Sequence, residues 1–97
     1  MSTLVILELK VKPDSVNTLK EMVKAVLPDT RSYAGCEGVT FYTNQDDGQT
    51  FIAVEKWASK AAYEKYLAWR TETGVMAKLG TMLAGPPSIR YFDAVDA

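Results

Sequence analysis

The chain of 97 residues contains no histidine. Histidine is the usual general base near neutral pH, a common zinc and haem ligand, and the partner of nucleophilic serine or cysteine. Its absence excludes the chemistries that depend on an imidazole, and we expect no metal site. Any catalysis must use carboxylates, phenols, arginine, lysine, amides, or the reactivity of the substrate itself.

Other features are scarce as well. Cys36 is the only cysteine, so it forms no disulfide within the chain, and we expect a small packing residue rather than a reactive thiol. A net charge of −1 gives no reason to expect nucleic acid or an anionic membrane as partner. No apolar run approaches the roughly 20 residues of a membrane helix, and residues 1–8 lack a basic leader. The sequence therefore predicts a cytoplasmic protein.

Hydrophobic periodicity divides residues 1–97 into the elements of a single domain. The predicted strands are Leu4–Val11, Val39–Asn44, Phe51–Trp57 and Ile89–Val95; the predicted helices run from Pro13 to about Ser32, from Ser59 to about Glu72, and over Val75–Leu83. This order is a ferredoxin-like βαββαβ unit of the α+β class, with an antiparallel sheet and helices on one face.

The predicted sheet is apolar on both faces. In the first strand, Leu4 and Ile6 lie opposite Val5 and Leu7, and the third and last strands repeat this pattern. An antiparallel sheet with helices on one face ordinarily has a polar second face. We therefore expect a homodimer in which two sheets pack face to face.

The second predicted helix carries a cation in its apolar stripe. Tyr66 and Arg70 are one turn apart on the face that should meet the core, and Trp57 ends the strand just before this helix. These groups suggest a site for a small aromatic or anionic ligand. Alternatively, Arg70 extends to the helix edge or pairs with Glu55 or with a carboxylate of a second copy, and Trp57 fills the core.

Further polar residues have two interpretations each. Tyr42 and Asn44 share a strand face and could contact a substrate, although Asn44 also suits the turn that follows. Glu55 should be paired if buried, with Arg70, Arg31 or a cation of a second copy; a role as general base is the alternative.

Several segments together resemble a known family. Thr30-Arg31 with Gly35-Cys36, the segment Glu55-x-Trp57-x-Ser59-x-x-Ala62, and the aromatic strand Ile89–Phe92 are similar to the antibiotic biosynthesis monooxygenase family of dimeric α/β barrels. The resemblance covers nearly the whole chain. It implies that the ligand sits between the helices and the sheet of each protomer.

The chain departs from the family pattern at three positions. Tyr33 stands where an acidic residue is common, and Tyr66 stands where a histidine is common, nine residues after Trp57. Met76 lies near the position of the axial histidine of related haem-degrading enzymes, so we do not expect the protein to degrade haem.

The resemblance implies a monooxygenase without cofactor that acts on a small phenol or quinol. Arg70 would hold the substrate as a phenolate, Tyr66 would donate a hydrogen bond or relay a proton, and Trp57 would line the site. Four further residues are candidates for substrate binding: Tyr33, Tyr42, Asn44 and Met76. The alternatives are a non-catalytic ligand-binding or stress-response module, and an isomerase of a small metabolite.

Overall fold

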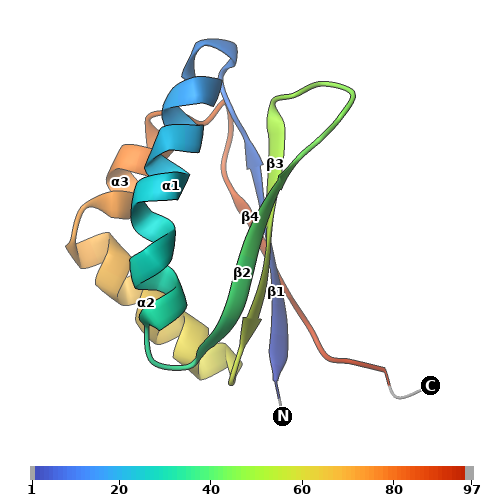
Figure 1. The fold of residues 1–97 in the computed structure, drawn as a ribbon, viewed down its shortest axis with the longest axis vertical. Coiled ribbons are helices and arrows are strands. Elements are labelled where there is room, and N and C mark those ends of the chain that lie inside the picture. The colour runs from blue at the N-terminus through green and yellow to red at the C-terminus, as the bar shows by residue number, and fades with distance from the viewer. Residues whose placement is uncertain (1, 96–97) are drawn as a thin grey trace.

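A four-stranded antiparallel sheet covered by helices on one face forms the fold in the computed structural model, which describes residues 2–95 (Figure 1). The sheet order is β2-β3-β1-β4, as in a ferredoxin-like fold, and this confirms the predicted α+β class. The elements are β1 (Thr3–Lys10), η1 (Pro13–Ser15), α1 (Val16–Ser32), β2 (Cys36–Thr43), β3 (Thr50–Trp57), α2 (Lys60–Glu72), α3 (Val75–Gly80) and β4 (Ser88–Phe92).

Alternation along the strands separates an inner face from an outer face. The inner residues of β1, namely Val5, Leu7 and Leu9, are buried beneath the helices. Val5 lies opposite Glu55 of β3 and Tyr91 of β4 in the strand register. The inner face therefore carries one carboxylate within an otherwise apolar and aromatic surface.

Three predicted boundaries are wrong by a few residues. β2 begins at Cys36 because Cys36 pairs with Trp57 across a bulge before Gly38, which hides the alternation in the sequence. β4 ends at Phe92, and α3 ends at Gly80. Ser15 makes no capping hydrogen bond for α1, whereas the Oγ of Ser59 caps α2 by accepting from the N–H of Ala62 at 3.0 Å.

The loop between α1 and β2 passes very close to α2. Gly35 has a φ of +92°, a left-handed conformation that favours glycine. A Cβ atom at Gly35 would lie 2.8 Å from the Cβ of Ala62. The carbonyl of Gly35 also accepts the N–H of Ala58 at 2.8 Å. These contacts fix the start of α2 against the end of β3.

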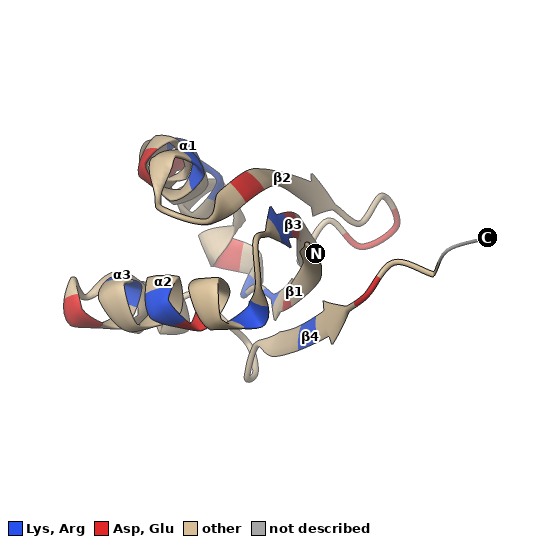
Figure 2. Cartoon of the chain, turned by 90° about the horizontal axis from the view of Figure 1, so that it is seen from below, with Lys and Arg blue, Asp and Glu red and all other residues tan. Residues whose placement is uncertain are grey.

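Acidic and basic residues are interspersed along the chain, with no element carrying charges of one sign in a long run (Figure 2). Glu8, on the outer face of the sheet, lies 3.6 Å from both Lys10 and Arg90. Within residues 2–95, no helix is both long enough and apolar enough to cross a membrane.

Candidate functional site

Helix α2 directs three polar or aromatic side chains into the protein interior. Tyr63, Tyr66 and Arg70 follow one another at intervals of three and four residues, and all three are buried. Arg70 is 4% exposed, so its charge lies in the interior as the helical spacing predicts.

Arg70 is held by a network of neutral hydrogen-bond acceptors. Its Nε donates to the hydroxyl of Tyr66 at 2.9 Å, and its Nη2 donates to Oγ1 of Thr30 at 2.9 Å and to the carbonyl of Val26 at 2.8 Å. The hydroxyls of Thr30 and Tyr66 are themselves 2.7 Å apart. Within residues 2–95, no carboxylate forms an ion pair with Arg70. The network leaves a buried positive charge without a counter-ion.

Two aromatic rings also lie against the guanidinium. Its Cζ lies 4.4 Å from the ring centroid of Trp69 and 5.4 Å from that of Tyr66, which are cation–π distances. Tyr33 stacks on Trp69 with centroids 5.0 Å apart and meets Tyr66 edge-on at 5.3 Å. Tyr33 therefore packs against the aromatic rings of the network, and it does not line the cavity described next.

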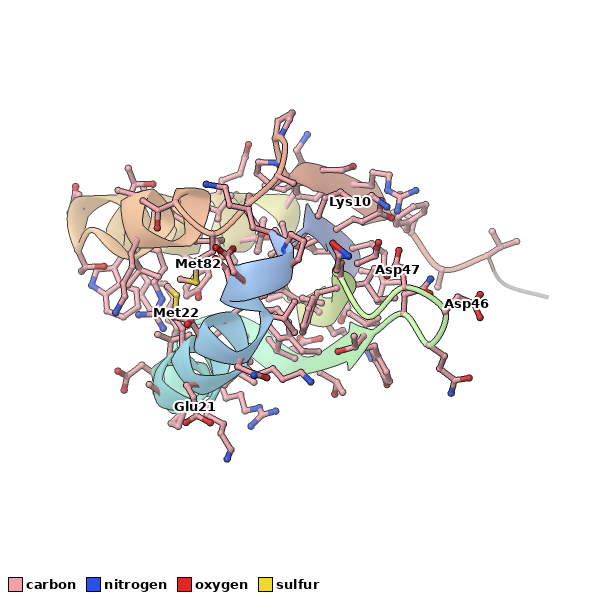
Figure 3. The ribbon with its side chains drawn as sticks, turned by 90° about the horizontal axis from the view of Figure 1, so that it is seen from above. Lys10, Glu21, Met22, Asp46, Asp47 and Met82 are labelled. Carbon is pink, nitrogen blue, oxygen red and sulfur yellow. The ribbon has the colours of Figure 1, made fainter. Side chains whose placement is uncertain are left out.

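A cavity of about 70 Å³ lies between the helices and the sheet. Its wall is mostly aliphatic and includes Leu19, Met22 and Met76. Met22 projects into the region between α1 and α3, toward Met82 (Figure 3). The polar residues of the wall are Thr30, Glu55, Tyr63, Tyr66 and Arg70.

The cavity volume limits what can bind without movement. A buried water needs about 10–15 Å³ and an apolar cavity that binds benzene is about 150 Å³, so 70 Å³ accommodates a few waters or a small fragment. A phenol ring fits only if side chains of the cavity wall move. Met22 and Met76 are unbranched and flexible, and they are the wall residues best suited to move.

Glu55 is the carboxylate on the inner face of the sheet. It is 4% exposed, and its Oε1 accepts the indole N–H of Trp57 at 3.1 Å. Burial raises the pKa of the Glu55 carboxyl to about 7, while the hydrogen bond from Trp57 opposes this rise. The predicted pairing with Arg70 or Arg31 is wrong within the chain, because Arg31 instead donates from Nε and Nη2 to the carbonyl of Val39.

Trp57 is completely buried and lies at the centre of an aromatic cluster. Its ring centroid is 4.9 Å from that of Tyr66, 5.5 Å from that of Tyr63 and 6.5 Å from that of Tyr33. It is not among the residues that line the cavity, and its N–H is already donated to Glu55. Trp57 therefore occupies the position of a core residue, which was the alternative interpretation. Its indole contacts Glu55, which does line the cavity.

Tyr42 and Asn44 are not brought to this cavity, contrary to the expectation that they adjoin the same site. Tyr42 pairs with Ile52 on the outer face and is 52% exposed. The Oδ1 of Asn44 accepts the backbone N–H groups of Asp46 and Asp47 at 2.8 and 3.2 Å, which is an Asx turn. Figure 3 shows these two aspartates at the tip of the β2–β3 hairpin, away from the helices.

The structure thus brings together Tyr66, Arg70 and Met76 of the predicted site residues, together with Glu55, the alternative general base, and adds Thr30 and Tyr63. Tyr63 belongs to the helical stripe that the sequence predicts, but nothing in the spacing distinguishes it from a core residue. The neighbouring Cys36 is half-buried, and burial raises the pKa of its thiol, which fits a packing role.

A ferredoxin-like sheet with a buried polar site beneath its helices defines a small α+β protein able to enclose a ligand. Residues 2–71 match the model of a protein family, antibiotic biosynthesis monooxygenase. The chain therefore belongs to the antibiotic biosynthesis monooxygenase family.

Individual relatives are distant in sequence and close in fold. Rv0793 of Mycobacterium tuberculosis is 23% identical over 85 residues, which are 88% of this chain and 83% of that protein. Its solved structure superposes with a TM-score of 0.86 at 22% identity, over 100% of this chain and 98% of that one. A crystal structure of an antibiotic biosynthesis monooxygenase gives a TM-score of 0.88 at 20% identity, over 97% and 99% of the two chains.

The protein sll1783 of Synechocystis is 25% identical over 84 residues, which are 87% of this chain. The match covers 57% of sll1783, so this chain spans little more than half the length of that relative. At these identities the structural matches establish a shared fold, and family membership supports a general monooxygenase-like function.

Proposed function

We propose that the protein is a cofactor-independent monooxygenase that acts on a small phenol or quinol held in the cavity between the helices and the sheet. The observation that carries this proposal is the buried charge of Arg70, which lies at the wall of an otherwise mostly aliphatic cavity and forms no ion pair within residues 2–95. Such a charge stabilises an anion formed from a substrate that enters uncharged. The small volume favours a substrate of one ring over a polycyclic one.

The chemistry follows from the electron-rich phenolate. With its proton removed, the substrate can transfer electrons to molecular oxygen, so that one oxygen atom is incorporated and the other leaves as water. The substrate supplies the two electrons that form this water. Arg70 stabilises the phenolate, and Tyr66, whose hydroxyl is already held by Arg70 and Thr30, positions the guanidinium and can exchange a hydrogen bond with the substrate.

The test is oxygen uptake by the purified, metal-stripped protein with a panel of single-ring and polycyclic hydroquinones and phenols, with products followed by mass. We expect uptake with single-ring substrates and incorporation of one oxygen atom. Arg70→Met should lower kcat/KM by about 100-fold, the cost of losing one preorganised charge donor. Lys65→Met removes an exposed cation from the same helix and should leave the rate unchanged.

Absence of uptake across the panel would contradict the proposal. Conversion without oxygen would indicate an isomerase, and tight binding of an unchanged compound would indicate a ligand-binding module. An Arg70→Met variant with full turnover would remove Arg70 from the mechanism.

We also propose that two copies pair through the outer face of the sheet. Leu4, Phe92 and Tyr42 are exposed there, beside the partly buried Ile6 and Val54. The helices cover only the other face, so this surface has no cover within residues 2–95 (Figure 1). A group of exposed apolar side chains on one sheet face is typical of an interface.

Light scattering should therefore give the mass of a dimer for the native protein. Val54→Asp places a carboxylate between Ile6 and Thr40 in the strand register and should give a monomer. Ala68→Asp, on the exposed side of α2, is the matched control and should remain dimeric. A monomeric native protein, or a dimeric Val54→Asp variant, would contradict this interface.

A further inference from the structure

Two buried polar groups at the cavity have hydrogen-bonding capacity that the protein does not use. Glu55 accepts one hydrogen bond through Oε1, and within residues 2–95 its Oε2 has no partner; the hydroxyl of Tyr63 has none either. Every completely buried side-chain nitrogen or oxygen in this part of the chain does have a partner. Oε2 of Glu55 and the hydroxyl of Tyr63 must therefore keep some contact with open space.

Both residues border the cavity. Tyr63 is only 1% exposed and Glu55 only 4%, yet both line the cavity wall. The ring of Tyr63 is enclosed by Trp57 and Tyr91, each in an edge-on contact. The negative charge of Glu55 also raises the pKa of Tyr63, beyond the larger effect of burial, which places the two groups in one electrostatic neighbourhood.

The surroundings of Glu55 leave its charge uncompensated by direct contact. Val5 and Val39 flank it on the neighbouring strands, and it forms no ion pair within residues 2–95. Among titratable groups, Tyr63 of α2 and Cys36 of β2 are electrostatically coupled to Glu55. Tyr66 and Arg70 of α2 line the same cavity, Arg31 of α1 lies near Cys36, and Tyr91 of β4 lies beyond Tyr63.

We propose that Glu55 is the base of the cavity: its free Oε2 takes the proton of a ligand hydroxyl, while the hydroxyl of Tyr63 hydrogen-bonds the same ligand. The O–H bond of the ligand breaks, its electron pair stays on the ligand oxygen, and the proton joins Oε2, so that the carboxylate becomes neutral as the ligand becomes an anion. The inference deepens the proposed function and rests on it for the nature of the ligand, a single-ring phenol.

The local charges suit this transfer. The carboxyl of Glu55, with its pKa raised to about 7 by burial, is a stronger base than an ordinary glutamate and is largely ionised at pH 8. An ordinary phenol has a pKa of about 10, so its proton moves to Glu55 only if the anion is stabilised. Arg70, at the wall of the same cavity, supplies the positive charge that stabilises it.

The experiment uses 4-fluorophenol as the probe, without oxygen, so that binding and proton transfer are measured separately from turnover. At pH 8 the free probe is neutral, and its ¹⁹F chemical shift reports ionisation when it is bound. We expect the probe to be ionised when bound to the native protein. The infrared carbonyl band of a protonated carboxylic acid should appear at the same time, because Glu55 has taken the proton.

Glu55→Gln keeps the size of the side chain and an oxygen for the Trp57 indole, and it should reduce the ionised fraction of bound probe at least about tenfold and abolish the carboxylic acid band. Tyr63→Phe should weaken binding by up to about tenfold, the value of one hydrogen bond, and keep the band. Glu64→Gln changes an exposed carboxylate of α2 and should alter neither signal.

The inference is overturned if Glu55→Gln ionises the probe as well as the native protein does, if the native protein binds only the neutral form, or if the probe does not bind at millimolar concentration. The infrared band of the native protein tests the same step without any variant. Proton transfer without oxygen uptake would overturn the proposed function and leave Glu55 as the base, so the two failures are distinguishable.

Discussion

Trp57→Ala should lower the free energy of unfolding by about 3–5 kcal/mol, as expected when a fully buried aromatic side chain is truncated in a core. The indole is completely buried and contacts the rings of Tyr33, Tyr63 and Tyr66, so its loss leaves a void among groups that have little room to close over it. It also removes the hydrogen bond from the indole N–H to the Glu55 carboxylate. Because domains are stable by about 5–15 kcal/mol, this one substitution threatens the fold.

Urea unfolding at a fixed protein concentration measures this loss. Trp69→Ala is the matched control, since Trp69 is only half-buried and should cost clearly less. Trp57→Phe keeps most of the packing but lacks the N–H, so it should cost less than Trp57→Ala and raise the pKa of Glu55 further. Equal losses for Trp57→Ala and Trp69→Ala would show that the aromatic cluster does not depend on Trp57.

The stability of the native protein should fall as the pH rises from about 4.5 to about 7, by up to about 3 kcal/mol. Glu55 has a pKa of 4.5 when exposed and about 7 when folded. Below pH 4.5 the carboxyl is protonated in both states, so this stability is fully present. As the pH rises, the unfolded chain releases its proton first, and the stability is lost up to and through the folded pKa.

The sequence contains no side chain whose ordinary pKa lies between pH 5 and pH 8. Histidine, which ordinarily titrates there, is absent. Asp47 is a carboxyl with a lowered pKa, held by hydrogen bonds from Thr50 and Gln49, so its contribution is lost only as the pH falls below about 3.8. The two effects therefore occupy separate ranges of pH.

Urea unfolding from pH 4.5 to 8 measures the effect. Glu55→Gln should remove the pH dependence: it should match the native protein near pH 4.5 and exceed its stability at pH 8. The variant would thus be more stable at pH 8 and, on the mechanism proposed above, less able to remove a proton from the ligand. This trade-off between stability and activity is expected when a catalytic group is buried at a cost in stability. A difference between the two proteins that is constant with pH would contradict the shifted pKa of Glu55.

The order of strands and helices could be predicted from the sequence because α1 has a clear helical period and the short apolar strands are bounded by glycine, proline and aspartate turns. The helical spacing of Tyr63, Tyr66 and Arg70 also predicts that Arg70 points inward. The start of β2 could not be predicted, since the bulge before Gly38 shifts the alternation. The end of β4 depends on where its pairing with the antiparallel strand β1 stops. Phe92 pairs with Leu4, and Thr3, the first residue of β1, has no partner in β4.

The site was less predictable because it depends on register and distance. The outward direction of Tyr42 follows from its pairing with Ile52, which the sequence does not specify. A buried carboxylate and a buried arginine on adjacent elements suggest an ion pair, and only their placement reveals that they instead face one cavity separately. The role of Trp57 as donor to Glu55 likewise depends on the rotamers of two side chains on one strand.

The close approach of Gly35 to Ala62 links two positions that are 27 residues apart in the sequence. Because this geometry leaves no room for a larger pair, a relative with a larger residue at either position should have a displaced loop or a shifted helix. A shift of α2 would carry Tyr63, Tyr66 and Arg70 with it and change the size of the cavity. The residue at position 62, which does not line the cavity, would then influence the size of the cavity.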